Sequence, residues 1–183
     1  MLPSLIITSL IMVLAQLPAL HPLLNWDASL IQQGQYWRIL TAHFTHTNWT
    51  HLAMNCAGLW VICWFFRDSW STKRFWMALT VISLLVSMTL PLTNTQWYAG
   101  LSAVLHGLFA LFAVIEIING RHTSVWLLVG LTVKIGWENL AGPSHSTEAM
   151  INARVAVEAH LAGAIAGLLL GLTIYLRKRL DIK

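Results

Sequence analysis

The sequence predicts an all-α membrane protein in which six transmembrane helices form one bundle. Apolar residues make up 57% of the chain and charged residues only 10%, whereas an ordinary soluble domain carries roughly 25% charged residues. The apolar residues gather in six runs, and most basic residues stand at the ends of those runs. The whole chain, residues 1–183, is therefore expected to be a single transmembrane domain.

The predicted helices are short for membrane spans, because a span needs about 20 apolar residues. Helices of this length suit a bundle around which the bilayer is locally thin. The first run lacks a basic n-region and a clear small-x-small cleavage site, so it is interpreted as a retained helix and not as a signal peptide. The six predicted ranges are 2–20, 50–66, 75–91, 101–119, 122–138 and 153–176.

The basic residues predict which side of the membrane each loop occupies. If all six runs span, eight basic residues fall on one side, which is expected to be the cytoplasm and to hold both termini. Only Arg38 and Arg154 fall on the opposite side. Lys134 lies inside the fifth run, four residues before Glu138, with which it is expected to pair. The eight cytoplasmic residues are Arg67, Lys73, Arg74, Arg121, Arg177, Lys178, Arg179 and Lys183.

The long first loop, residues 21–49, is predicted to lie on the outer side. It is rich in Trp, His, Asn and Thr. Its aromatic residues are typical of a membrane interface, so the loop is expected to lie on the membrane or partly in it. These aromatic residues are Trp26, Tyr36, Trp37 and Trp49.

Four polar side chains from three predicted helices lie at a similar depth. At about 1.5 Å per helical residue, Ser102 lies about 28 Å from Arg121, and His160 lies about 25 Å from Arg177. By the same measure, His51 and Asn55 lie about 24 and 18 Å from Arg67. Polar side chains inside a membrane usually face the bundle interior or a water-filled cavity. The four are therefore expected to line one cavity near the outer side.

Ser102 and His160 are the first candidate pair. A serine hydroxyl is a weak nucleophile that needs an adjacent base, and a neutral histidine can take its proton and pass it to the leaving amine. No carboxylate is evident beside His160, because Glu158 is two residues away and faces elsewhere on a helix, so a Ser-His dyad is the simpler hypothesis. The alternative is that Ser102 packs between helices and His160 is a hydrogen-bonded core histidine.

His51 and Asn55 are the second candidate pair, because residues four apart share one face of a helix. Both can donate hydrogen bonds to an oxyanion, as can the backbone N–H of Ser102; the alternative is a polar clamp between helices. Gly100 permits a tight turn before the serine. His106, one helical turn after Ser102, either lines the cavity or competes as the base, although the geometry of one helix disfavours the second role.

Glycines after His160 form a small-residue stripe, Gly163, Gly167 and Gly171. Such a stripe lets another helix approach closely. The neighbour is expected to be the helix that carries Ser102, which has Gly107 and Ala110. This approach would bring His160 within hydrogen-bond reach of Ser102.

A metal or haem site is the main alternative use of the histidines, since His43, His46 and His51 lie close in sequence. The sequence contains neither an H-E-x-x-H nor a C-x-x-C-H pattern, so neither a metal nor another cofactor is expected. A small transporter would need a polar path through the bundle, whereas the polar layer lies on the outer side. The net charge of +4 does not indicate nucleic acid, because the basic residues sit at the ends of the runs.

Together these residues resemble the rhomboid intramembrane serine proteases. The resemblance implies that Ser102 is the nucleophile, that His160 is the general base, and that His51 and Asn55 help form the oxyanion hole. His46 matches a recurrent position of the family, and with Gly100 and His106 it is expected to line the cavity. The matching motifs, which fall between about Gln35 and Gly171, are Trp37-Arg38, His51-x-x-x-Asn55, Gly100-x-Ser102 and Ala159-His160-x-x-Gly163-x-x-x-Gly167.

One departure from the family pattern is Ala103, where rhomboids usually have glycine. The string G-L-S-A-V-L-H-G is similar to the rhombosortase subfamily. That resemblance implies an enzyme of the bacterial inner membrane whose site opens toward the periplasm and contacts membrane lipids. Its substrates would be single-pass exported proteins with a C-terminal tail of Gly-Gly, an apolar helix and a basic cluster, which it would cleave by hydrolysis or by transfer to an amine. The alternative is a catalytically inactive rhomboid-like protein that binds client helices, although such relatives usually lack the serine or the histidine.

Overall fold

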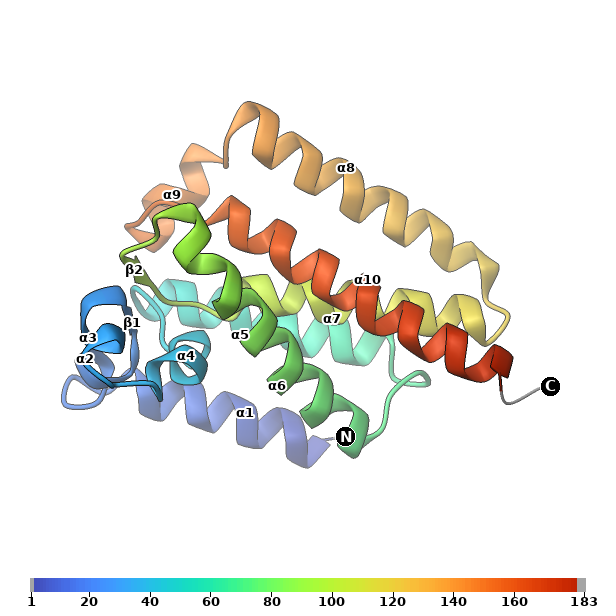
Figure 1. The fold of residues 1–183 in the computed structure, drawn as a ribbon, viewed down its shortest axis with the longest axis horizontal. Helices are drawn as coiled ribbons and strands as arrows, with labels where there is room; N and C mark the ends of the chain where they lie inside the picture. The colour runs from blue at the N-terminus through green and yellow to red at the C-terminus, as the bar shows by residue number, and fades with distance from the viewer. Residues whose placement is uncertain (1, 181–183) are drawn as a thin grey trace.

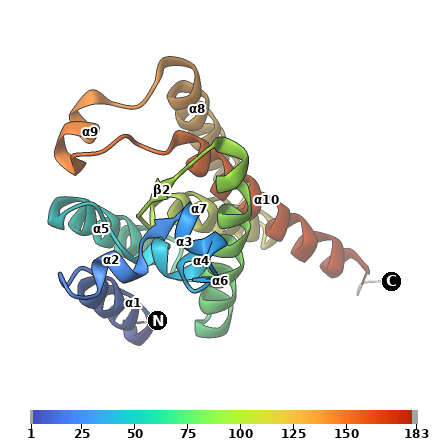
Figure 2. The ribbon, with the colours of Figure 1, turned by 60° about the vertical axis from the view of Figure 1, so that its left-hand side comes forward.

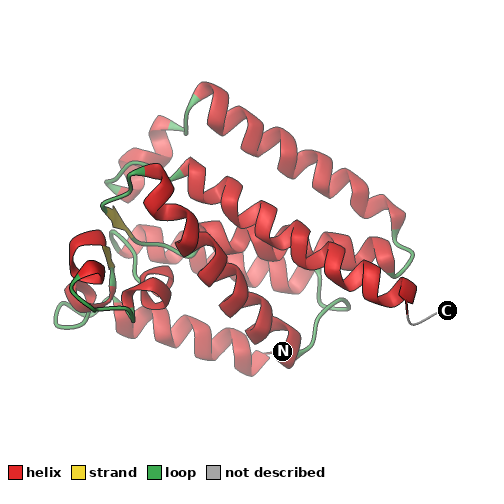
Figure 3. Ribbon diagram, in the orientation of Figure 1, coloured by secondary structure: helices red, strands yellow, loops and turns green. Residues whose placement is uncertain are grey.

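The computed structural model describes residues 2–180, which form a mainly helical molecule (Figures 1 and 3). Long helices follow one another in alternating directions along the molecule (Figure 1). The connections α5–α6 and α7–α8 are short, whereas residues 16–48 and 142–156 form longer connections with helical elements of their own. The long helices are α1 (Leu2–Ala15), α5 (Trp49–Phe65), α6 (Thr72–Thr89), α7 (Ser102–Ile118), α8 (Val125–Ala141) and α10 (Val157–Leu180).

Short elements fill the connections, and a pair of two-residue strands joins the first loop to the segment before α7. Strands β1 (Trp26–Asp27) and β2 (Trp97–Tyr98) pair in antiparallel fashion, with Trp26 opposite Tyr98. This pairing anchors the segment that leads into Ser102. The short helical elements are α2 (His21–Leu24), α3 (Ala28–Gln32), α4 (Arg38–Thr41), η1 (Ala42–Phe44), η2 (Leu90–Thr93), η3 (His122–Ser124) and α9 (His145–Ile151).

Several helices begin or end away from the predicted positions, and the local sequence explains why. Helix α1 ends at Ala15 instead of residue 20, because Pro18 lacks the N–H that a helix needs. Helix α8 begins at Val125 instead of residue 122 because η3 comes first, and it runs to Ala141, after which Gly142 adopts a φ of 84°. Helix α10 begins at Val157, four residues later than predicted, and extends to Leu180.

Helix α7 forms the centre of the bundle, with α5, α6 and α10 around it (Figure 2). Eleven of its seventeen residues are buried. Helix α8 is peripheral in comparison, since Ile135 is its one buried residue. The serine at the start of α7 is therefore held by the most tightly packed element, and α8 borders it from outside.

Helix α10 lies against α7 at very short distance through its glycine stripe. A Cβ atom at Gly163 would overlap the carbonyl group of Ala103, and one at Gly167 would overlap the carbonyl group of Gly107. Only glycine permits this approach of two backbones. The predicted contact between the helices that carry His160 and Ser102 is thus present.

Within residues 2–180, two helical segments are long and apolar enough to cross a membrane, Thr72–Thr93 and Val157–Leu180. Helices Leu2–Ala15 and Ser102–Ile118 are apolar but shorter. Large apolar side chains nevertheless cover much of the outer surface of the bundle, including Leu10, Trp64, Met77, Trp126 and Leu172.

Arg38 holds the first loop together instead of presenting a charge at the surface. Its side chain is 2% exposed. It donates hydrogen bonds to the carbonyl oxygens of Pro22 and Asn25, at 3.1 and 2.7 Å, and to the side chains of Asn25 and Gln35, both at 2.9 Å. The neighbouring Trp37 donates to the carbonyl oxygen of Leu23 at 3.0 Å. The Trp37-Arg38 pair is therefore a structural element of this loop.

Replacing Arg38 with alanine should lower the free energy of unfolding by about 3 kcal/mol, because several partly buried acceptors would lose their donor. Arg154→Ala is the matched control, since its exposed pair with Glu158 should contribute no more than about 1 kcal/mol. Thermal unfolding of the detergent-solubilised proteins measures both. Equal loss in the two variants would contradict the structural role of Arg38.

Candidate active site

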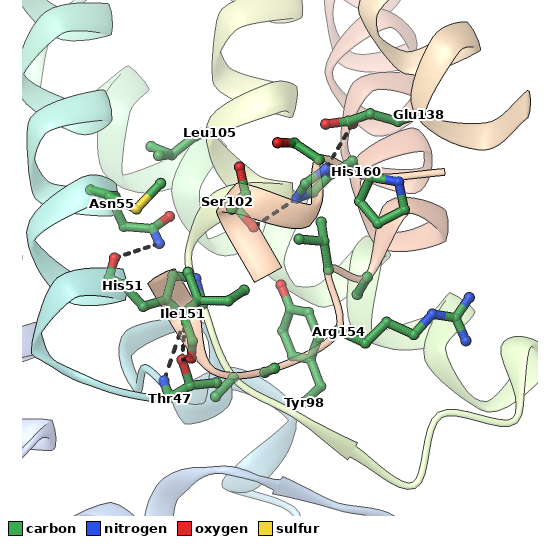
Figure 4. A pocket seen from close by; sticks show the side chains of 18 of the residues that line it. Thr47, His51, Asn55, Tyr98, Ser102, Leu105, Glu138, Ile151, Arg154 and His160 are labelled. Carbon is green, nitrogen blue, oxygen red and sulfur yellow. Dashed lines mark hydrogen bonds and ion pairs between the residues drawn. The ribbon is translucent and has the colours of Figure 1, made fainter. Parts of the chain in front are cut away.

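A cavity of about 460 Å³ opens at one end of the bundle, between α5, α7, α8 and the start of α10 (Figure 4). Both candidate pairs of the sequence line it, because Ser102, His160, His51 and Asn55 all reach its wall. Three helices that are far apart in sequence thus supply polar side chains to one space.

Ser102 is the first residue of α7, and the turn before it depends on Gly100. The φ of Gly100 is 137°, a backbone conformation that residues other than glycine rarely adopt. A Cβ atom there would also lie 2.8 Å from Cε1 of the His51 ring. As the N-terminal residue of the helix, Ser102 has a backbone N–H without an intrahelical partner. The turn therefore leaves both the hydroxyl and the N–H of this residue at the cavity.

His160 and Ser102 are in hydrogen-bond contact. Nε2 of His160 lies 2.9 Å from Oγ of Ser102, although 58 positions separate the residues (Figure 4). The His160 side chain is almost entirely buried. The glycine-mediated contact of α10 with α7 places His160, three residues before Gly163, beside the start of α7.

A carboxylate lies on the other side of the His160 ring, contrary to the prediction that none is placed there. Oε2 of Glu138 is 3.1 Å from Nδ1 of His160 (Figure 4). Glu158 faces elsewhere, as expected, and pairs with Arg154 at 2.9 Å. Glu138 is also 2.7 Å from Nζ of Lys134, so the ion pair expected from their spacing is present.

The sequence does carry a signal for Glu138. Glu138 follows Arg121 by seventeen residues, the same separation that places His160 before Arg177. The depth count that grouped Ser102 with His160 therefore places Glu138 in the same layer.

His106 stacks on His160 and does not bond the serine hydroxyl. The ring centroids are 4.2 Å apart and the rings are inclined by only 18°. Nδ1 of His106 lies 2.7 Å from the carbonyl oxygen of Ser102, and Nε2 lies 3.0 Å from Nζ of Lys134. Both nitrogens are thus engaged, which argues against His106 as the base for Ser102.

His51 and Asn55 are oriented by hydrogen bonds at the edge of the cavity. The backbone N–H of Thr47 donates to Nδ1 of His51 at 3.4 Å, so the ring proton lies on Nε2. Asn55 donates one amide proton to the carbonyl oxygen of His51 at 3.0 Å, which leaves its second amide proton available. Each side chain therefore retains one donor.

His46 and Gly100 do not line the cavity, contrary to expectation. His46 is fully buried behind His51, with the ring centroids 5.0 Å apart in an edge-to-face arrangement. Gly100 also lies against the His51 ring. Both residues therefore support His51 from behind instead of facing the cavity.

Among the described residues, a group of donor atoms close enough together for a metal ion comes from His106, Glu138 and His160, within 4.8 Å of one another. They do not come from His43, His46 and His51, the group considered from the sequence. Nζ of Lys134 already bonds two members of this set, His106 and Glu138. A divalent cation there would be repelled by the ammonium group.

The fold and the cavity define a helical bundle with a serine–histidine pair where one of its central helices begins. The sequence matches the Rhomboid domain over residues 33–177. The chain therefore belongs to the rhomboid family of multi-pass membrane proteins, which includes intramembrane serine proteases. No curated protein matches the sequence significantly.

Proposed function

We propose that this protein is an intramembrane serine protease in which Ser102 is the nucleophile and His160 is the general base. The observation that carries the proposal is the 2.9 Å separation between Nε2 of His160 and Oγ of Ser102 at the wall of a cavity. A histidine that merely packs in a core needs some hydrogen-bond partner. It does not need a helix-leading serine with a free N–H, nor two further donors at the same cavity.

The acylation half of the reaction follows from this geometry. Oγ of Ser102 attacks the carbonyl carbon of the substrate peptide while its proton passes to Nε2 of His160. The oxyanion accepts hydrogen bonds from the Ser102 N–H, from Nε2 of His51 and from the free amide proton of Asn55. Each such donor is worth about 3 kcal/mol in the transition state. The C–N bond then breaks, and His160 passes its proton to the leaving amine.

The second half returns the enzyme to its starting state. Water or an amine-bearing acceptor attacks the acyl-serine carbon, and His160 takes a proton from it. The bond from carbon to Oγ breaks, and Oγ recovers a proton from His160. The product is a carboxylic acid with water, or a new amide with an amine.

In the membrane, we infer six spanning helices with both termini in the cytoplasm. The connections α5–α6 and α7–α8 lie at the same end of the molecule as the end of α10, opposite the cavity (Figure 1). Arg67, Arg74, Arg121 and Arg177 stand at this end, which the positive-inside rule places in the cytoplasm. The cavity then opens toward the outer side, the periplasm in a bacterial inner membrane.

A side opening supports access for a substrate helix from the lipid. A second cavity of about 460 Å³ lies between α5, α7 and α8 and has mainly apolar walls that include Ile62, Phe109 and Leu127. It shares His106 and Lys134 with the first cavity. The apolar helix of a single-pass substrate suits this groove, and its end would then lie close to Ser102.

The substrate class follows from the rhombosortase-like string around Ser102. We propose exported single-pass proteins with a C-terminal tail of Gly-Gly, one apolar helix and a basic cluster. Glycine fits a narrow cavity and bends at little cost, so cleavage near the two glycines suits this site. The basic cluster would remain on the cytoplasmic side.

Reaction with a fluorophosphonate probe tests the nucleophile. Oγ of Ser102 attacks phosphorus, fluoride leaves, and His160 takes the hydroxyl proton. Membranes that contain the wild type should give a labelled band, and membranes with equal amounts of Ser102→Ala should give none. A co-expressed substrate with the Gly-Gly tail should be cut only by the wild type, and a tail in which leucine replaces both glycines should resist.

Normal cleavage by Ser102→Ala would overturn the mechanism. Wild-type protein that neither reacts with the probe nor cuts the substrate would favour an inactive, helix-binding member of the family. Cleavage of both tails at equal rates would overturn the substrate assignment and leave the serine mechanism in place.

A further inference from the structure

We propose that Glu138 is a positioning residue that keeps the Nε2 atom of His160 free to accept the proton of Ser102, and that the ammonium of Lys134 partly balances the charge of Glu138. This inference rests on the proposed function and deepens it from a serine–histidine pair to a serine–histidine–glutamate array. It concerns residues of α8 that the sequence motifs leave without a role.

The direction of each hydrogen bond at His160 follows from the chemistry of its partners. The ionised carboxylate of Glu138 can only accept, so Nδ1 of His160, at 3.1 Å, carries the proton. In the neutral ring Nε2 then has none, and it accepts from the hydroxyl of Ser102 at 2.9 Å. Without Glu138, the proton could occupy either nitrogen, and the form with a proton on Nε2 cannot act as a base.

The direction of each hydrogen bond at His106 also follows from its partners. The carbonyl oxygen of Ser102 can only accept, so Nδ1 of His106 donates to it at 2.7 Å. The ammonium of Lys134 can only donate, so Nε2 of His106 accepts from it at 3.0 Å. His106 is therefore held neutral while its ring stacks on His160 at 4.2 Å.

Charge gives a second reason for a carboxylate at this place. When His160 takes the serine proton it becomes a cation, almost buried and close to the ammonium of Lys134. Glu138 lies between the two and bonds both, Lys134 through Oε1 at 2.7 Å and His160 through Oε2. The titratable and charged groups facing His160 are thus His51 from α5, His106 from α7, and Glu138 with Lys134 from α8.

Variants of the two α8 residues should shift the pH dependence of probe labelling in opposite directions. Labelling needs unprotonated His160, so its rate constant rises with pH to a plateau. Glu138→Gln removes the negative charge beside His160, so the midpoint should move to lower pH. Lys134→Met removes the positive charge that counteracts it, so the midpoint should move to higher pH. Each shift should be about one pH unit, as is typical when a charge near an ionisable group is removed.

The plateau rate provides a further readout. Glu138→Gln should lower it about 100-fold, because the neutral amide no longer selects the ring form with free Nε2. Glu158→Gln is the matched control. It also removes a carboxylate near His160 in sequence, but Glu158 bonds Arg154 and not the ring, so the rate and the midpoint should stay at wild-type values.

The experiment uses the full chain in lipid nanodiscs, with thermal unfolding measured for each variant. A Glu138→Gln protein with the wild-type midpoint and plateau would overturn the assignment, as would midpoints of both variants moving in one direction. Lys134→Met retains Glu138, so the test stands even if Glu138→Gln fails to accumulate. Loss of wild-type labelling on addition of a chelator would also overturn it, because a metal would then occupy the place assigned to Lys134.

Failure of this inference is distinct from failure of the proposed function. If Ser102→Ala abolishes labelling while Glu138→Gln has no effect, the serine protease mechanism is supported and the positioning role of Glu138 is refuted. If wild-type labelling does not depend on Ser102, the proposal that this protein is a serine protease with Ser102 as its nucleophile is refuted.

Discussion

Replacing His160 with alanine should lower the plateau rate of fluorophosphonate labelling by at least about a thousandfold. The hydroxyl of Ser102 would lose its proton acceptor at 2.9 Å, and a serine without an adjacent base is a weak nucleophile. The wild type and the variant should accumulate to similar levels, since the ring lies at the cavity wall and not in the packed centre around α7. The measurement is the rate of labelling in nanodiscs across a range of pH.

His106→Ala distinguishes His160 from the other histidine near Ser102. His106 bonds the carbonyl oxygen of Ser102 and stacks on His160, so its loss should slow labelling about tenfold by freeing the His160 ring. If His106→Ala eliminated labelling while His160→Ala retained most of it, His106 would be the base and the assignment made from the helix positions would be wrong.

Much of the fold could be predicted because each membrane helix is a continuous run of apolar residues in the sequence. The all-α class follows from the apolar runs, and the resemblance to rhomboids agrees with the match to the Rhomboid domain over residues 33–177. The close contact between α7 and α10 could also be anticipated, since small residues four apart form a stripe visible in a single segment. The distances of Ser102 and His160 from the basic ends of their helices also predict that the two residues lie in one layer.

What the sequence did not indicate depends on contacts between distant segments. The pairing of Trp26 with Tyr98 joins strands of only two residues, too short to leave a periodic pattern. His46 matches a recurrent family position five residues before His51, but the chain is irregular as far as Asn48, so this spacing does not tell which ring faces the cavity. The depth of Glu138 can be counted from Arg121, but its bond to His160 cannot be predicted, because Lys134 is a sufficient partner in the local sequence and His160 lies on another helix.

The close approach of α7 and α10 predicts a large effect of Gly163→Ala on both stability and the rate of labelling. Gly163→Ala should destabilise the protein by about 1–3 kcal/mol, the usual cost of overpacking, because the new methyl group overlaps the carbonyl group of Ala103. The backbones must separate, since no flexible side chain can yield there. Ala103 follows Ser102 directly and His160 precedes Gly163 by three residues, so the separation displaces the base from the nucleophile. A displacement of about 1 Å costs about 100-fold in rate.

Gly136→Ala provides the matched control, because a Cβ atom at this α8 position meets nothing within 4 Å. Alanine in a helix is favoured over glycine by roughly 0.5–1 kcal/mol, so this variant should unfold at the wild-type temperature or above and label at the wild-type rate. Gly163→Ala should instead combine a lower unfolding temperature with slow labelling. If it unfolded earlier but still reacted at the wild-type rate, α10 would yield without moving His160, and the glycine stripe would serve stability alone. The joint loss would show that the stripe sets the distance on which the chemistry depends.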